Sequence, residues 1–103
     1  MKVLVIQSSP NRDGLTAACA AAAVEGARQV GASVEDVRLN DLPLERCRAC
    51  ERGWGTCLAE HRCQVEDGFQ ALQAQVASAD CLVLVTPVYW GEPSESAKAF
   101  LDR

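Results

Sequence analysis

The chain has 103 residues, a length that fits a single domain. Apolar residues make up 49% and charged residues 23% of it, which is the ordinary balance of a globular protein. The net charge of −4 argues against a nucleic-acid-binding surface, and no apolar run approaches the roughly 20 residues that a membrane helix needs. We therefore expect a cytoplasmic protein that binds neither nucleic acid nor membranes.

The stretch from Lys2 to Thr16 predicts an anion-binding loop. Its apolar residues 3–6 are typical of a short buried strand, the polar residues 8–14 of a turn, and a helix is expected to begin near Leu15. Strand, turn and helix in this order aim several backbone N–H groups at one point, which binds anions and above all phosphate. Side-chain donors are available on Ser8, Ser9, Asn11, Arg12 and Thr16.

A helix and a second strand are expected next. The helix covers residues 15–30, with apolar residues on one face at helical spacing, and Cys19 is expected there as a small core residue. The strand covers residues 33–39 and is polar enough to suit the edge of a sheet, since a central parallel strand is apolar on both faces.

The second half of the chain repeats this alternation after an irregular cysteine-rich loop at 47–63. A helix is expected from Asp67, which has capping-box spacing to Gln70, and an apolar strand at residues 81–85. A loop at 86–93 then leads to a last helix with Ser94 as its N-cap. One face of this helix is expected to carry Ala97, Phe100 and Leu101.

The alternation of strands and helices predicts an α/β fold with a parallel sheet, strand order 2-1-3 and helices on both faces, a three-layer αβα arrangement. Ligands of such sheets bind outside the carboxyl ends of the strands, where the strand order switches. The loops at that point are 8–16 and 87–93, of which the second carries Tyr89 and Trp90. They suit a ligand with a phosphate at one end and a planar ring system at the other.

Three stretches of the chain resemble the NADPH-dependent FMN reductase family, and within it the iron–sulfur flavoproteins: SSPNRDGLT, DCLVLVTPVYWGEPSESAKAFLDR and the cysteine loop between them. The resemblance implies a flavodoxin-like fold, FMN as cofactor and NAD(P)H as co-substrate. It covers nearly all of this chain, but the chain covers only about the first half of such a domain. We therefore expect residues 1–103 to be the N-terminal part of an FMN-binding domain with a cysteine-rich insertion at 47–63.

The resemblance also assigns residues to the cofactor. It maps the phosphate loop of the family onto Ser9, Asn11, Arg12, Gly14 and Thr16. It maps the isoalloxazine loop onto Pro87, Val88, Tyr89, Trp90 and Gly91. The family has a basic residue where Asn11 stands, so Arg12 is expected to reach the phosphate instead.

Four of the six cysteines lie in the loop at 47–63, and they are candidate metal ligands: Cys47, Cys50, Cys57 and Cys63. The C-x-x-C spacing of the first two suits a metal centre or a redox pair, and four thiolates are the usual complement of a [4Fe–4S] cluster.

The cysteine spacing departs from that of the similar proteins. Their third cysteine corresponds to Gly53, whereas Cys57 stands four residues later; Cys63 matches their last one. A [4Fe–4S] cluster is the leading interpretation. Zinc with the help of His61, a reversible disulfide and inert free thiols remain open alternatives.

No acid–base set for catalysis can be assembled, and His61 is the only histidine. This fits a flavin enzyme, in which the cofactor performs the redox chemistry, so no catalytic residue is assigned. The leading hypothesis is an NAD(P)H-dependent, FMN-binding oxidoreductase that passes electrons to a small-molecule or protein acceptor. One alternative is a small metal- or thiol-redox-responsive module without flavin, and another is a flavodoxin-like electron carrier.

The third expected strand, residues 81–85, is apolar at every position, yet the order 2-1-3 leaves it at an edge. An exposed apolar edge recruits other chains. We therefore expect a homo-oligomer, exchanged elements or marginal stability, together with weak FMN affinity, because the other half of the domain would complete the flavin crevice.

Overall fold

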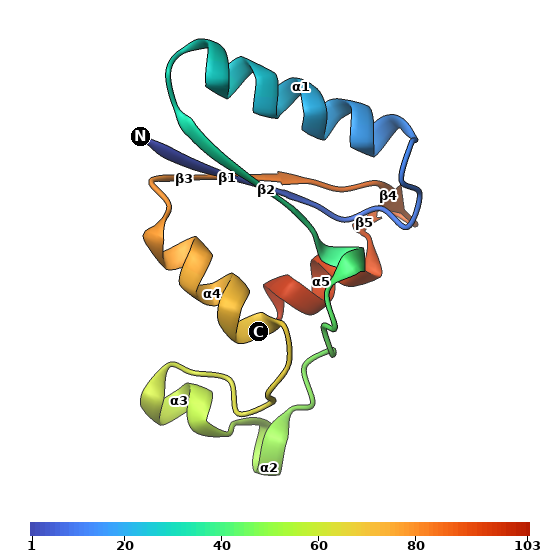
Figure 1. The fold of residues 1–103 in the computed structure, drawn as a ribbon. Coiled ribbons are helices and arrows are strands. Elements are labelled where there is room, and N and C mark those ends of the chain that lie inside the picture. The colour runs from blue at the N-terminus through green and yellow to red at the C-terminus, as the bar shows by residue number, and fades with distance from the viewer.

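A computed structural model describes residues 1–103 and contains a three-stranded parallel sheet between helices (Figure 1). The strands are β1 (Lys2–Gln7), β2 (Ser33–Arg38) and β3 (Cys81–Val85), in the order β2-β1-β3. Both pairings of β1 are parallel. The predicted α/β class and strand order are therefore confirmed.

Helix α1 (Leu15–Gln29) covers one face of the sheet, above it in Figure 1. Its Ala20 and Val24 are buried against Val3 and Val5 of β1. Since alanine adds little bulk, the helix axis can approach the strands closely, and this face of the core is thin.

Helices α4 (Phe69–Ser78) and α5 (Glu95–Leu101) lie on the opposite face. They enclose the larger part of the core, in which Leu4 and Ile6 of β1 pack with Phe69, Leu72 and Phe100. Central β1 is thus buried from both sides, which explains its continuous apolar run.

Both edge strands match the sequence expectations. Strand β2 has no buried residue, since Ser33 and Asp36 are exposed and its other four residues are half-buried. Strand β3 pairs only with β1, and it leaves Cys81 exposed and the side chain of Leu82 44% exposed. An apolar strand therefore forms an open edge of the sheet.

Two details of the expected helix faces are wrong. Cys19 is exposed rather than buried in the core, and it is not among the α1 residues that pack against Val3 and Val5. Leu101 is also exposed, and Ala99 is buried in its place beside Ala97 and Phe100. In both helices, the short apolar pattern did not determine which face of the helix is buried.

The helix-starting signals hold. The Ser94 Oγ accepts a hydrogen bond from the Ala97 N–H at 3.4 Å, so Ser94 is the N-cap of α5. The Gln70 side chain accepts from the Asp67 N–H at 3.1 Å, as in a capping box. The Asp67 carboxylate accepts from the Phe69 N–H at 2.9 Å.

Both predicted loops contain short regular elements. The cysteine-rich segment includes α2 (Cys50–Gly53), in which Glu51 and Arg52 depart from helical backbone angles, and the helical turn α3 (Thr56–Glu60). The segment after β3 folds into a two-stranded hairpin, β4 (Val88–Tyr89) and β5 (Glu92–Pro93). A 3-10 turn, η1 (Leu39–Asp41), follows β2. None of the helices has the length and apolar character required to cross a membrane.

Candidate functional site

The loop after β1 starts at the carboxyl edge of the sheet, where it is fastened to β3. The Ser8 N–H donates to the Val85 carbonyl at 3.0 Å, and its hydroxyl lies 3.4 Å from the same oxygen. Ser8 and Ser9 are both buried. The start of the loop is therefore as fixed as the strand that precedes it.

The interior of this loop is folded by its own side chains. The Ser9 Oγ accepts a hydrogen bond from the Asn11 N–H at 3.1 Å, and the Asn11 Oδ1 accepts from the Asp13 N–H at 3.3 Å. A Cβ atom on Gly14 would lie 2.6 Å from the Asn11 Nδ2. Glycine at position 14 therefore allows the amide of Asn11 to rest against the start of α1.

The first turn of α1 has backbone N–H groups without hydrogen-bond partners, and it directly follows this loop. Its N-cap, Gly14, supplies no side-chain hydrogen bond, and the first turn contains no acidic residue. The free N–H groups of a helix start and the helix dipole both favour an anion. Thr16 adds a hydroxyl in this turn, where it is half-buried.

The facing loop after β3 is a braced hairpin. The Thr86 Oγ1 donates to the Pro87 carbonyl at 2.9 Å and accepts from the Ser94 N–H at 3.0 Å, which closes the base of the hairpin. Trp90 and Gly91 form its tip with φ values of 53° and 76°. Positive φ at both central residues is the pattern of a type I′ turn.

The two loops border one cavity of about 450 Å³. It is lined by Ser9, Asn11, Gly14, Leu15, Thr16, Cys19, Val85, Thr86, Pro87, Val88 and Tyr89. The structure thus brings together most of the predicted phosphate-loop and ring-loop residues. Arg12, Trp90 and Gly91 do not line this cavity, and the side chain of Trp90 is fully exposed.

The guanidinium of Arg12 is engaged elsewhere. It pairs with Asp41 through N–O distances of 2.6 and 3.3 Å. Arg38 is the arginine that contacts the loop, because its Nη2 donates to the Ser9 carbonyl at 3.1 Å. Its Nη1 is buried without a hydrogen-bond partner. Sequence reasoning missed Arg38, although it ends β2 and so lies beside the carboxyl end of β1.

The residues around this cavity fit a phosphorylated planar ligand. Free helix-start N–H groups and the hydroxyls of Ser9 and Thr16 suit a phosphate. Arg38 does not line the cavity: it contacts the loop through the Ser9 carbonyl and is ion-paired with Asp41. The side chains of Val88 and Tyr89 add apolar surface at the other side of the cavity. FMN carries both features, a phosphate and a planar ring system.

A second cavity, of about 210 Å³, is lined by all four predicted cysteine ligands. These are Cys47, Cys50, Cys57 and Cys63. Arg48, Trp54 and Arg103 also border it, whereas His61 does not. The four thiols form the donor set of an iron–sulfur cluster. No three potential ligand side chains converge closely enough for a single metal ion, so the thiols would have to turn inward around a cluster.

The backbone of the cysteine segment is strained. Ala49, Glu51 and His61 have φ values of 47°, 54° and 55°. L-residues pay roughly 1–2 kcal/mol each for such conformations, and they concentrate at ligand sites and switch regions. Gly55 permits a close approach here, since a Cβ atom at that position would lie 3.0 Å from the Cys50 Cβ.

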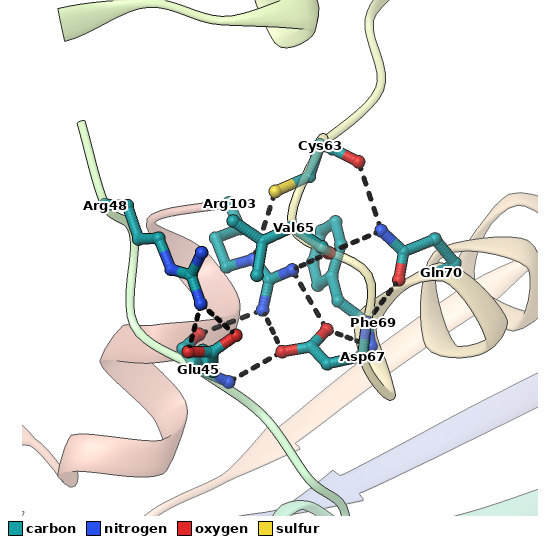
Figure 2. Close-up of polar contacts among 8 residues, drawn as sticks. All are labelled: Glu45, Arg48, Cys63, Val65, Asp67, Phe69, Gln70 and Arg103. Atoms are coloured by element: carbon teal, nitrogen blue, oxygen red, sulfur yellow. Dashed lines mark hydrogen bonds and ion pairs between the residues drawn. The ribbon is translucent and has the colours of Figure 1, made fainter. Parts of the chain in front are cut away.

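A buried ion pair beside this segment joins Asp67, which precedes α4, to Arg103, which follows α5 (Figure 2). The Arg103 guanidinium binds the Asp67 carboxylate through N–O distances of 2.7 and 2.9 Å. The hydrogen bonds from Arg103 lower the pKa of Asp67 to about 2. The same carboxylate accepts from the Glu45 N–H at 2.7 Å. The sequence predicts for Asp67 only a capping role at the start of α4.

Comparison with known proteins finds curated relatives that match over the whole of this chain. An iron–sulfur flavoprotein of Archaeoglobus fulgidus is 31% identical over 100% of this chain and 45% of its own length. One of Methanocaldococcus jannaschii is 30% identical over 100% of this chain and 51% of its own length. The chain thus spans about half the length of these curated relatives.

A structural match supports the flavodoxin-like fold. RosB, solved with a bound 8-demethyl-8-formylriboflavin-5′-phosphate intermediate, superposes with a TM-score of 0.77 and 23% identity, covering 98% of this chain and 40% of its own. The sequence model of the NADPH-dependent FMN reductase family matches residues 1–103. The chain therefore belongs to the NADPH-dependent FMN reductase family.

Proposed function

We propose that this protein binds FMN and acts as an NAD(P)H-dependent oxidoreductase that delivers electrons to a small-molecule or protein acceptor. The observation that carries the proposal is the 450 Å³ cavity between the loops after β1 and β3. It lies at the switch point of the sheet, where ligands of such folds bind. When bound, FMN would accept a hydride from NAD(P)H and release electrons to the acceptor.

The loop after β1 would hold the phosphate end of the ligand. The hydroxyls of Ser9 and Thr16 would donate to it, together with the Asn11 amide and the N–H groups that start α1. Arg38 would support the loop from outside the cavity, because its guanidinium donates to the Ser9 carbonyl and is ion-paired with Asp41. Arg12 joins the phosphate only by exchanging its present partner, Asp41.

Residues 87–91 would border the ring end of the ligand. Val88 and Tyr89 line this side of the cavity and would exclude water from the bound ring. Trp90 is fully exposed on a backbone conformation that disfavours a bulky side chain. A ligand that covers its indole ring would offset this cost.

We propose that the four thiols of the cysteine cavity would hold a [4Fe–4S] cluster, which would supply one-electron transfer when bound. Four thiols around one cavity and the names of the relatives support this assignment. A zinc ion or a reversible disulfide would use the same thiols, and all six cysteines are free here. Free thiols suit a reducing compartment such as the cytoplasm.

We also propose that residues 1–103 are part of an FMN domain that associates through the open edge of β3. The exposed Leu82 on this edge supports this, because unpaired apolar edges attract further strands. The strand that pairs with β3 would come from a second copy of the chain or from further strands of the domain. Sedimentation at several concentrations tests the first case, because association between copies increases with protein concentration, and a monomer at every concentration would contradict it.

The phosphate loop is tested by titrating FMN into the protein and following flavin fluorescence. Replacing Ser9→Ala and Thr16→Ala together should weaken FMN by about 1–3 kcal/mol, the range of charge-assisted hydrogen bonds. Ser33→Ala with Ser78→Ala is the matched control, because β2 starts at Ser33 and α4 ends at Ser78, away from this cavity. Equal FMN affinity in all three proteins would refute the assignment.

The alternative functions are separated by two further measurements. A visible spectrum with metal analysis of anaerobically purified protein distinguishes a flavoprotein from a metal- or thiol-responsive module without flavin. NAD(P)H oxidation then distinguishes a reductase from a carrier that only accepts and donates electrons.

A further inference from the structure

We propose that Arg103 is a positioning residue for the metal centre of the cysteine cavity, and that it acts by holding Cys63 as the fixed sulfur ligand. The inference rests on the proposed metal binding at this cavity. Its basis is a hydrogen bond from the Arg103 Nε–H to the Cys63 Sγ, with an N–S distance of 3.3 Å (Figure 2).

Arg103 is itself rigidly held. Its side chain is 1% exposed. Nη1 donates to the Glu45 carbonyl at 2.9 Å and to Asp67, while Nη2 donates to the Val65 carbonyl at 2.8 Å and to Asp67. With Nε on Cys63, every nitrogen of the guanidinium is committed, and the group also lies 4.5 Å from the Phe69 ring centroid. Arg103 therefore cannot turn away from the sulfur without breaking a buried network.

Cys63 is the only cavity cysteine whose sulfur is bound by a side chain. The Cys47 Sγ accepts one backbone hydrogen bond, from the Ala49 N–H at 3.4 Å. Cys50 and Cys57 have no hydrogen bond to sulfur; Cys50 begins α2, whose backbone is irregular, and Cys57 lies in α3. The Cys63 backbone is fixed as well, because Gln70 donates to its carbonyl at 3.1 Å.

This geometry has a chemical consequence for metal binding. A metal-bound cysteine sulfur keeps negative charge, and a guanidinium N–H is a strong partner for a charged acceptor. Outer partners that orient a ligand typically change metal affinity by 10–100-fold when they are removed. The other thiols would therefore gather around a sulfur that is already in place.

The test uses Cd²⁺ as a thiophilic probe on the reduced protein under anaerobic conditions, with thiolate-to-metal charge-transfer absorption as the readout. Arg103→Lys keeps the positive charge but loses the Nε–H donor, and it should weaken Cd²⁺ binding by about 10–100-fold. The control is Arg62→Lys, which alters the neighbour of Cys63 in sequence but does not border the cavity. It should leave the affinity unchanged.

A double-mutant cycle with Cys63→Ser separates positioning from a general loss of stability. If Arg103 acts through this sulfur, Arg103→Lys has no further effect once Cys63 is replaced. An equal weakening in both backgrounds overturns the inference, and so does unchanged binding in Arg103→Lys alone; in both cases the metal site itself stands. A wild-type protein that shows no charge-transfer band refutes the metal site and the inference together.

Discussion

The loop after β1 and the cysteine segment at 47–63 both gather ligand-type side chains, but they are held in opposite ways. Residues 3–9 are buried without interruption, and the loop continues directly from the central strand. No residue from 47 to 63 is buried, and the segment contains three residues with strained positive φ. The first region is fixed by the sheet, and the second mainly by contacts at its ends.

The difference indicates two kinds of binding site. A preformed loop loses little conformational entropy when its ligand arrives, so its donors are available at once. A segment with few buried contacts opens at low free-energy cost, and its ligand would supply part of its stability. The Arg103–Asp67 pair is the point where the second region is joined to the core.

The largest effect is expected from breaking that junction. Asp67→Ala leaves the buried Arg103 guanidinium without its anionic partner and should lower the free energy of unfolding by about 3 kcal/mol. Urea denaturation measures it. Lys98→Ala is the control, because it removes the exposed ion pair with Asp102 and should change stability by less than about 1 kcal/mol. Similar losses in both variants would contradict the role given to the junction.

Metal binding should sharpen the contrast between the two regions. In hydrogen exchange, amides of β1 should be strongly protected and those of 47–63 weakly protected without metal. A metal at 100 times its dissociation constant should stabilise the bound segment by about 2.7 kcal/mol, slowing exchange there and not in β1. Strong protection of 47–63 in the metal-free protein would show that it is preformed after all.

The junction should also weaken in acid. Arg103 holds the pKa of Asp67 at about 2 in the folded protein, below the ordinary value of 3.8. The carboxylate therefore contributes its full stability above about pH 4 and loses it as the pH falls toward 2. The stability difference between wild type and Asp67→Ala should shrink over this window. A difference that stays constant from pH 5 to about 2 would contradict the assignment.

The smallest effect concerns the hairpin beside the phosphate loop. Trp90→Asn should stabilise the ligand-free protein by about 1 kcal/mol, because asparagine tolerates positive φ better than tryptophan, while weakening FMN. Trp54→Asn is the control for removing an exposed indole, since Trp54 has a φ of −139°. A destabilised Trp90→Asn would show that the indole packs on the protein rather than waiting for a ligand.

The fold was largely predictable because the apolar runs of β1 and β3 and the more polar sequence of β2 were each typical of a strand. Parallel pairing then placed the two loops at the same edge of the sheet. The shorter patterns failed, as with Cys19 and Leu101, since a few apolar residues do not determine the phase of a helix.

Side-chain partners at the sites were less predictable. Sequence position suggested that Arg12 would reach the phosphate. In the structure, the Arg12 guanidinium is instead ion-paired with Asp41 of η1. Arg38 and Arg103 act through contacts with residues far from them in the chain. Local sequence contains no signal for such pairs before the topology is known.

The central claim is that the loop after β1 binds the phosphate of a flavin. The most direct measurement compares the dissociation constants of FMN and riboflavin, which differ only in that phosphate, by fluorescence titration of the same protein. We expect FMN to bind at least about tenfold more tightly, the equivalent of one charge-assisted hydrogen bond of about 1.4 kcal/mol. Equal affinities for the two flavins would contradict the account.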